Sequence, residues 1–233
     1  VTSLGLASRL FLPNLLLAEA AVFAAGVVML RRRRGAAVQR LVGAVRARFA
    51  EIAEWSFSDR WLVSLVSGMA ILLCLQEFGL PTDNYDSLAY QLPRVVEWYQ
   101  QGTILMQPMQ WAGWINSFPY AWNTVLFLMV APVGHDQLVL LPNLAAWLML
   151  GLAAYCLARL GGGYRCGSLA AAAFAMLMPL SVINVHSAHN DLPLGALFLS
   201  SVYWSIRGWR ERRPSSGLLA LAAGGMMLGT KTS

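Results

Sequence analysis

The chain has 233 residues, of which 58% are hydrophobic and only 12% are charged, and its formal net charge is +6. Soluble domains carry about 25% charged residues. The composition therefore excludes an ordinary soluble enzyme and predicts an all-α protein that crosses a membrane several times. Seven of the 17 basic residues lie between Arg31 and Arg48, and four lie between Arg207 and Arg213. In a membrane protein we interpret such clusters as topology signals, not as a nucleic-acid-binding surface.

The first sixty residues are predicted to form a part of their own. Leu10–Leu30 is the first predicted span, and Arg31–Arg34 end it. Residues 36–54 have the pattern of a basic amphipathic helix, which we expect to lie on an anionic cytoplasmic membrane face. We therefore assign residues 1–60 to an N-terminal transmembrane helix and a cytoplasmic amphipathic helix. The second predicted span, Trp61–Leu80, begins the rest of the chain.

The short apolar stretch Phe118–Val133 decides the predicted topology. If it crossed the membrane, residues 159–165 and 207–213 would lie outside, against the positive-inside rule. We therefore expect it to stay on the outer side as a juxtamembrane or re-entrant helix. The expected architecture is about six spans plus this outer helix. The last four spans are Gln137–Ala158, Gly167–Val185, Leu192–Ile206 and Gly217–Thr230.

The longest polar interval, Leu80–Gln110, separates two apolar regions on the predicted outer side. Asp86 or Ser87 is the expected N-cap of a helix whose apolar residues recur at helical spacing. Pro93 lies inside this pattern and predicts a kink or a break. Arg94 follows Asp86 by about two turns, so one amphipathic element carries both an anion and a cation. A lone Asp before a helix is most often only a cap.

Ionisable side chains from separate loops collect on the predicted outer face. A carboxylate can accept a proton from a hydroxyl nucleophile, and an Arg with a Lys can bind a phosphate. Together these groups suit transfer from a lipid-phosphate donor to an acceptor at the outer surface. Residues 189–191 could equally be a polar turn that caps the next helix, and the sequence has no metal-ligand spacing. The collected residues are Asp83, Asp86, Arg94, Glu97, His135, Asp136, His186, His189, Asn190, Asp191 and Lys231.

Residues 83–102, DNYDSLAYQLPRVVEWYQQG, resemble the first outer loop of the GT-C superfamily of membrane glycosyltransferases. The closest part of that superfamily is the bacterial relatives of the protein O-mannosyltransferases (family 39), which often have His at the position of Gln91. AHND at 188–191 and LGTK at 228–231 follow in a similar order. The resemblance implies that residues 61–233 form the N-terminal part of a GT-C-like catalytic domain. We interpret the chain, which begins at Val1, as a fragment that we expect to be inactive alone.

The resemblance implies an inverting sugar transfer from a polyprenyl-phosphate donor to a lipid, glycan or protein acceptor. It would occur at the outer face of the cell inner (plasma) membrane, in a multi-pass protein that needs no metal or cofactor. The family's first-loop Asp, which acts as base or orients the acceptor, corresponds to Asp86, with Asp83 as the second choice. Arg94 and Lys231 would face the donor phosphate.

The second outer loop of the family corresponds here to His189, Asn190 and Asp191, of which Asp191 would be the acidic residue. Two other functions are open. A secondary transporter should have charges near mid-membrane and repeated halves, and we find no internal repeat. A non-catalytic membrane subunit would leave Asp86 and Arg94 replaceable.

Overall fold

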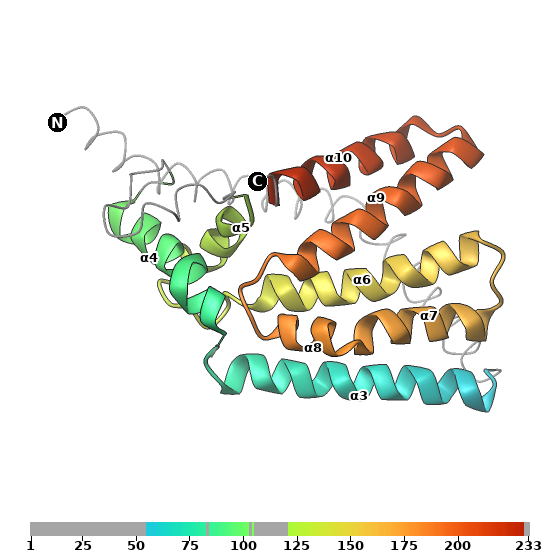
Figure 1. Cartoon of the computed structure of the whole chain (residues 1–233), viewed down its shortest axis with the longest axis horizontal. Coiled ribbons are helices and arrows are strands. Elements are labelled where there is room, and N and C mark those ends of the chain that lie inside the picture. The colour runs from blue at the N-terminus through green and yellow to red at the C-terminus, as the bar shows by residue number, and fades with distance from the viewer. Residues whose placement is uncertain (1–54, 83, 103, 105–120, 231–233) are drawn as a thin grey trace, which may run out of the picture. The chain divides into compact units, whose positions relative to one another are not determined.

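The computed structural model describes residues 55–82, 84–102, 104 and 121–230. Every regular element in these ranges is a helix, and no strand occurs among them (Figure 1). The predicted all-α class is therefore confirmed. The chain forms two compact units, residues 1–60 with 101–103 and residues 61–100 with 104–233. The predicted span at 10–30 and amphipathic helix at 36–54 lie outside the described residues.

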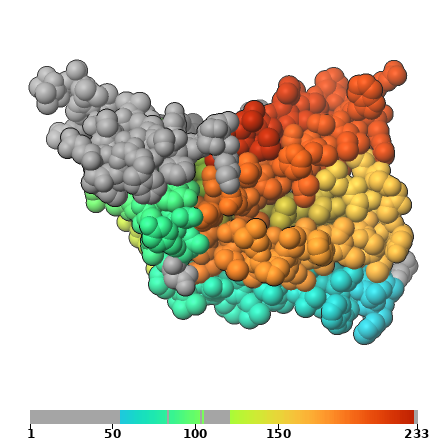
Figure 2. Space-filling view, viewed as in Figure 1, coloured from blue at the N-terminus to red at the C-terminus, as the bar shows by residue number. Residues whose placement is uncertain are grey.

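The second predicted span is a single helix, α3 (Phe57–Gly79). One stripe of this helix packs on the core through Val66, Met69, Ala70, Leu73 and Cys74, which recur at spacings of three and four. Figure 2 shows α7 and α8 directly beside α3 on this face. The other side of α3 exposes large apolar side chains, among them Ile71, Leu72, Leu75 and Phe78. Such a surface suits lipid rather than water.

Five further helices lie between residues 141 and 230 and run back and forth beside one another. They are α6 (Leu141–Leu160), α7 (Arg165–Leu177), α8 (Pro179–Val185), α9 (Asp191–Glu211) and α10 (Pro214–Thr230). By length and composition α3 and α6 could each cross a membrane, and the pair α7–α8 could form a third span. The pair is bent by 59°, whereas the sequence predicted one continuous span, Gly167–Val185.

Pro179 accounts for the bend between α7 and α8. A proline has no N–H to donate and pushes the preceding residue, here Met178, out of helical geometry. The observed ψ of Met178 is 133°. The break leaves carbonyls at the end of α7 without their helical donors, and the indole N–H of the fully buried Trp147 donates to the Met176 carbonyl at 2.7 Å. Trp147 thus fills the core and supports the bend.

α5 (Ala121–Val130) is the described part of the stretch expected not to cross the membrane. Ten residues of α-helix are about 15 Å long, half of a hydrocarbon core. The α6–α7 and α9–α10 turns, which carry the basic residues 159–165 and 207–213, lie at one end of the helices (Figure 1). The α8–α9 turn and the end of α3 lie at the other end, as the predicted topology requires.

Candidate active site

The helix of the first polar loop begins at Asn84, not at Asp86. The Asn84 carboxamide oxygen accepts hydrogen bonds from the N–H of Ser87 at 3.1 Å and from its hydroxyl at 3.2 Å, which is the bond pattern of an N-cap. Asp86 has helical dihedral angles and makes no capping hydrogen bond. The predicted capping role of Asp86 or Ser87 is therefore wrong, and the Asp86 carboxylate is directed elsewhere.

A π-helical turn, η1 (Ser87–Gln91), separates this start from α4 (Leu92–Gln101). Pro93 cannot donate to the carbonyl four residues before it, and the wider turn is the irregularity that the sequence predicted near this proline. Such turns interrupt α-helices mostly in single turns and often at functional sites. Asp86, directly before this π-helical turn, and Ser87, its first residue, both contact the α8–α9 turn.

His189 lies between two carboxylates from different loops. Its Nε2 is 2.5 Å from Asp86 Oδ2, and its Nδ1 is 3.4 Å from Asp191 Oδ2. An ionised carboxylate has only acceptor capacity, so the imidazole N–H is the donor toward Asp86. The His189 side chain is 17% exposed, whereas those of Asp86 and Asp191 are 38% and 39% exposed. The imidazole is thus more buried than the two carboxylates on either side of it, which are both partly exposed.

Tyr90, one turn after Asp86, belongs to the same cluster. Burial, followed by the charges of Asp86 and Asp191, raises the pKa of the Tyr90 phenol above its usual value. A neutral hydroxyl that stays protonated can donate a hydrogen bond beside two anions. The cluster therefore contains two carboxylates, which accept hydrogen bonds, together with one imidazole and one phenol.

Three polar side chains, those of Asn143, Ser87 and Asn190, hold the α8–α9 turn that carries His189. The Asn143 amide nitrogen, at the start of α6, lies 2.8, 2.5 and 3.0 Å from the carbonyl oxygens of Asn184, Ser187 and His189. Because the amide has two N–H groups, two of these carbonyls share one of them. The buried Ser87 hydroxyl accepts the Ala188 N–H at 2.8 Å. The Asn190 amide donates to the Thr230 carbonyl at 2.7 Å, which ties the turn to the end of α10.

His186 joins the same turn to the end of α3. Its Nε2–H donates to the Pro81 carbonyl at 3.1 Å, and the Thr82 hydroxyl donates to the His186 carbonyl at 3.2 Å. Its Nδ1 lies 3.6 Å from Glu77 Oε1, in a place where both side chains are buried. The end of α3 is thereby held against the turn on the side away from α10.

Arg94 lies in a buried contact between α4 and α5. It is 3% exposed, and its guanidinium donates to the Asn123 oxygen at 3.2 Å. The Asn123 amide in turn donates to the Gln91 carbonyl and side-chain oxygen at 3.1 and 2.6 Å. Burial lowers the pKa of Arg94, but an arginine remains charged at neutral pH. This network connects α5 to the end of the π-helical turn.

The structure thus brings together four of the predicted site residues, Asp86, His189, Asn190 and Asp191, around one turn. It places Arg94 in the separate α4–α5 contact. Asp83 and Lys231 lie outside the described residues. Within the described ranges no three His, Cys, Asp or Glu side chains are grouped so as to hold a metal ion.

Sequence reasoning missed Asn143 and Asn123. Both are almost fully buried and both organise the loops through hydrogen bonds. Each is a polar residue within an otherwise apolar helix, and that pattern marks a residue with a specific partner. The sequence therefore contains a signal for both residues, but that signal does not show which backbone groups each side-chain amide contacts.

The family model of dolichyl-phosphate-mannose-protein mannosyltransferases matches residues 116–233, which is just over half of the chain. The matched range contains the α8–α9 turn with His189 and Asp191, and it begins after Asp86 and Arg94. No curated protein and no solved structure matches the chain. The chain therefore belongs to the dolichyl-phosphate-mannose-protein mannosyltransferase family, whose members are membrane glycosyltransferases that use a dolichyl-phosphate sugar donor.

Proposed function

We propose that this protein transfers a sugar from a polyprenyl-phosphate donor to a hydroxyl group on the outer face of the plasma membrane, with inversion at the anomeric carbon. The acceptor is a lipid, a glycan or a protein, and the protein is multi-pass. Family membership supports the reaction class. The observation that carries the site assignment is the Asp86–His189 pair, which links the first loop to the family-matched region.

In the proposed reaction the acceptor oxygen attacks the anomeric carbon of the donor. The bond from that carbon to the phosphate oxygen breaks, polyprenyl phosphate leaves, and the acceptor proton passes to Asp86. The His189 N–H holds the carboxylate in place, and the 38% exposure of Asp86 leaves it accessible to the acceptor. General-base catalysis of this kind contributes about 10²–10⁴-fold to a rate.

An apolar groove supports the approach of a lipid donor to this cluster. A cavity of about 330 Å³ lies where α7–α8 bends away from α6 and α9. Leu150, Gly195 and Phe198 are among its lining residues, and Asp191 is one of its few polar ones. Because the donor's reactive bond must reach the site while its chain stays in lipid, we assign the chain to this groove.

The residues assigned to the donor phosphate, Lys231 and Arg94, rest mainly on the family resemblance. Lys231 follows Thr230, whose carbonyl is bonded to Asn190 in the site turn, and we retain Lys231 as a donor-phosphate residue. The role of Arg94 toward the phosphate stays a prediction, since its guanidinium is buried against Asn123. Asp83 remains the second choice for the base.

Two measurements test the proposal. In cells that express a cysteine-free background, Tyr85→Cys should react with a membrane-impermeant maleimide from outside, and Tyr164→Cys should react only after permeabilisation. Both positions are highly exposed, at 79% and 75%. Proton NMR of the product from a β-linked donor should show an α-linkage. Outside labelling of Tyr164→Cys would overturn the orientation, and a β-linked product would overturn inversion.

A further inference from the structure

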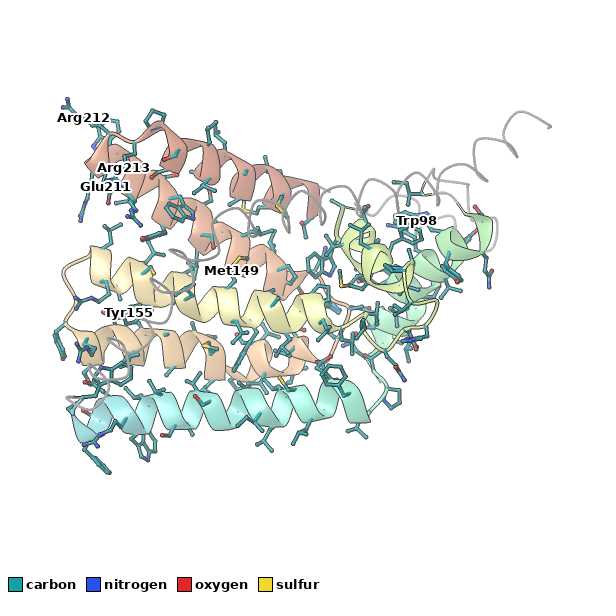
Figure 3. All side chains as sticks on the ribbon, turned by 180° about the vertical axis from the view of Figure 1, so that it is seen from behind. Trp98, Met149, Tyr155, Glu211, Arg212 and Arg213 are labelled. Atoms are coloured by element: carbon teal, nitrogen blue, oxygen red, sulfur yellow. The ribbon has the colours of Figure 1, made fainter. Side chains whose placement is uncertain are left out.

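The α9–α10 turn, at the end of the helices opposite to the candidate active site, presents an unusually basic surface. Figure 3 shows Glu211, Arg212 and Arg213 at the tip of this turn, far from Trp98 of α4. Residues 159–165 and 207–213, which form the two turns at this end, contain six arginines and one acidic residue.

Several of these arginines are already engaged within the protein. Arg210 donates to the Leu160 carbonyl at the end of α6 at 2.6 Å, and Arg159 donates to the Gly163 carbonyl at 2.9 Å. Arg207 pairs with Glu211 at 2.9 Å and lies over the rings of Tyr203 and Trp204. These contacts close the helix ends and need no external partner.

Arg212 and Arg213, at the tip of the turn, are more exposed to solvent, although Arg213 also contacts Glu211. Arg212 has a left-handed backbone, with φ 51° and ψ 36°, at the end of α9. Glycine is the preferred residue in this position because any side chain is unfavourable there. The Arg212 side chain is exposed and forms no ion pair with another described residue. The Arg213 side chain is 67% exposed, with its Nε 3.4 Å from Glu211.

An exposed tryptophan lies in the same segment. Trp209 is 88% exposed, and tryptophans with this exposure beside arginines are typical of the membrane–water interface. An Arg side chain carries a permanent positive charge that attracts the anionic oxygens of a phosphate. The surface formed by Trp209, Arg212 and Arg213 thus combines an apolar anchor with two outward cations.

We propose that this surface binds the phosphate of anionic phospholipids in the adjacent leaflet, with Arg212 and Arg213 as the phosphate ligands and Trp209 in the interfacial region. The charge balance of the two turns favours an anionic partner. The surface lies at the same end of the helices as the α6–α7 turn, and α6 is a candidate membrane span, which favours a headgroup over a soluble anion. The site is separate from sugar transfer, so its failure would leave the proposed function untouched.

Thermal unfolding of the purified protein, titrated with phosphatidylglycerol in zwitterionic micelles, tests the proposal. Wild type should be stabilised by phosphatidylglycerol and not by phosphatidylcholine. Arg212→Gly should unfold at or above the wild-type temperature without anionic lipid, because glycine suits the left-handed backbone. Its apparent affinity for phosphatidylglycerol should fall roughly fivefold, the effect of one arginine at an anionic surface.

Arg212→Lys is the charge-preserving control and should keep most of the response. Arg213→Gln, at an exposed position, should weaken binding by a similar factor without a change in basal stability. A wild-type response to phosphatidylglycerol in both Arg212→Gly and Arg213→Gln would overturn the proposal. An equal loss in Arg212→Lys and Arg212→Gly would also overturn it, since charge would then not be the cause.

Discussion

Asp86 and His189 are 103 residues apart in the sequence, and the Asp86 Oδ2 and His189 Nε2 atoms lie 2.5 Å apart. A second contact joins the same two segments. The hydroxyl of Ser87, the residue after Asp86, accepts a hydrogen bond from the N–H of Ala188, the residue before His189. Because the two loops meet through adjacent residues, the position of the carboxylate depends on how firmly the α8–α9 turn is held.

Asn143 is predicted to be the main support of that turn. Asn143→Ala would leave the carbonyls of Ser187 and His189 without the amide donor, whereas the Asn184 carbonyl would keep the Ser187 hydroxyl. The loss of stability should be about 1–3 kcal/mol, the cost of buried groups left unsatisfied. Thermal unfolding in detergent measures it. Asn184→Ala is the control, since only its main-chain carbonyl takes part; equal unfolding temperatures for Asn143→Ala and wild type would contradict the assignment.

The raised pKa of Tyr90 predicts a pH dependence of stability. The folded protein holds this proton more tightly than the unfolded chain, so the stabilisation is present below the ordinary tyrosine pKa of about 10 and is lost as pH rises through the raised value. Unfolding temperatures from about pH 8 to 11 should therefore fall more steeply for wild type than for Tyr90→Phe. The exposed Tyr164 supplies the control variant Tyr164→Phe, which should follow wild type. Parallel curves for wild type and Tyr90→Phe would refute the proposed environment.

Two of the predicted spans could be located from the sequence, because burial in lipid requires long apolar runs; α9 and α10 are not among the candidate spans in the described residues. Trp61–Leu80 and Gln137–Ala158 agree with α3 and α6 to within a few residues. The cap was not predictable to the residue, because Asn84 and Asp86 are both good capping residues. The pairing of Asp86 with His189 leaves no periodic trace in the sequence. It follows from the packing of two loops that only the folded chain brings together.

Arg94 can be tested against its neighbour Asn123. Arg94→Ala and Asn123→Ala each break the bond between the two side chains and should each reduce stability, by about 1.5–3 kcal/mol for the charged bond. If Arg94 also binds the donor phosphate, Arg94→Ala should raise the donor KM well beyond the value for Asn123→Ala. Equal donor KM values in Arg94→Ala and Asn123→Ala would show that Arg94 has a structural role and does not bind the donor phosphate.

Gly195 offers a test of the groove. A Cβ at this position would lie 3.8 Å from the Leu150 side chain, an ordinary contact, so Gly195→Ala should fold normally. Gly195→Leu should fill the groove and raise the KM for a long-chain polyprenyl donor more than for a two-isoprene analogue. Gly225→Leu, in α10 with open space around it, is the control. A rise in KM that is independent of chain length would place the chain elsewhere.

The central claim is that the Asp86 carboxylate serves the acceptor hydroxyl. Asp86→Asn keeps an oxygen that can accept the His189 N–H, so its unfolding temperature should stay close to that of wild type, but the amide cannot take a proton. The exposed Asp136, on the predicted outer side and before α6, supplies the matched control Asp136→Asn. The measurement is single-turnover transfer from a polyprenyl-phosphate sugar in membranes that contain equal amounts of each folded variant. We predict that Asp86→Asn slows transfer by about 10²–10⁴-fold while Asp136→Asn stays near wild type. Near-normal transfer by Asp86→Asn would contradict the account.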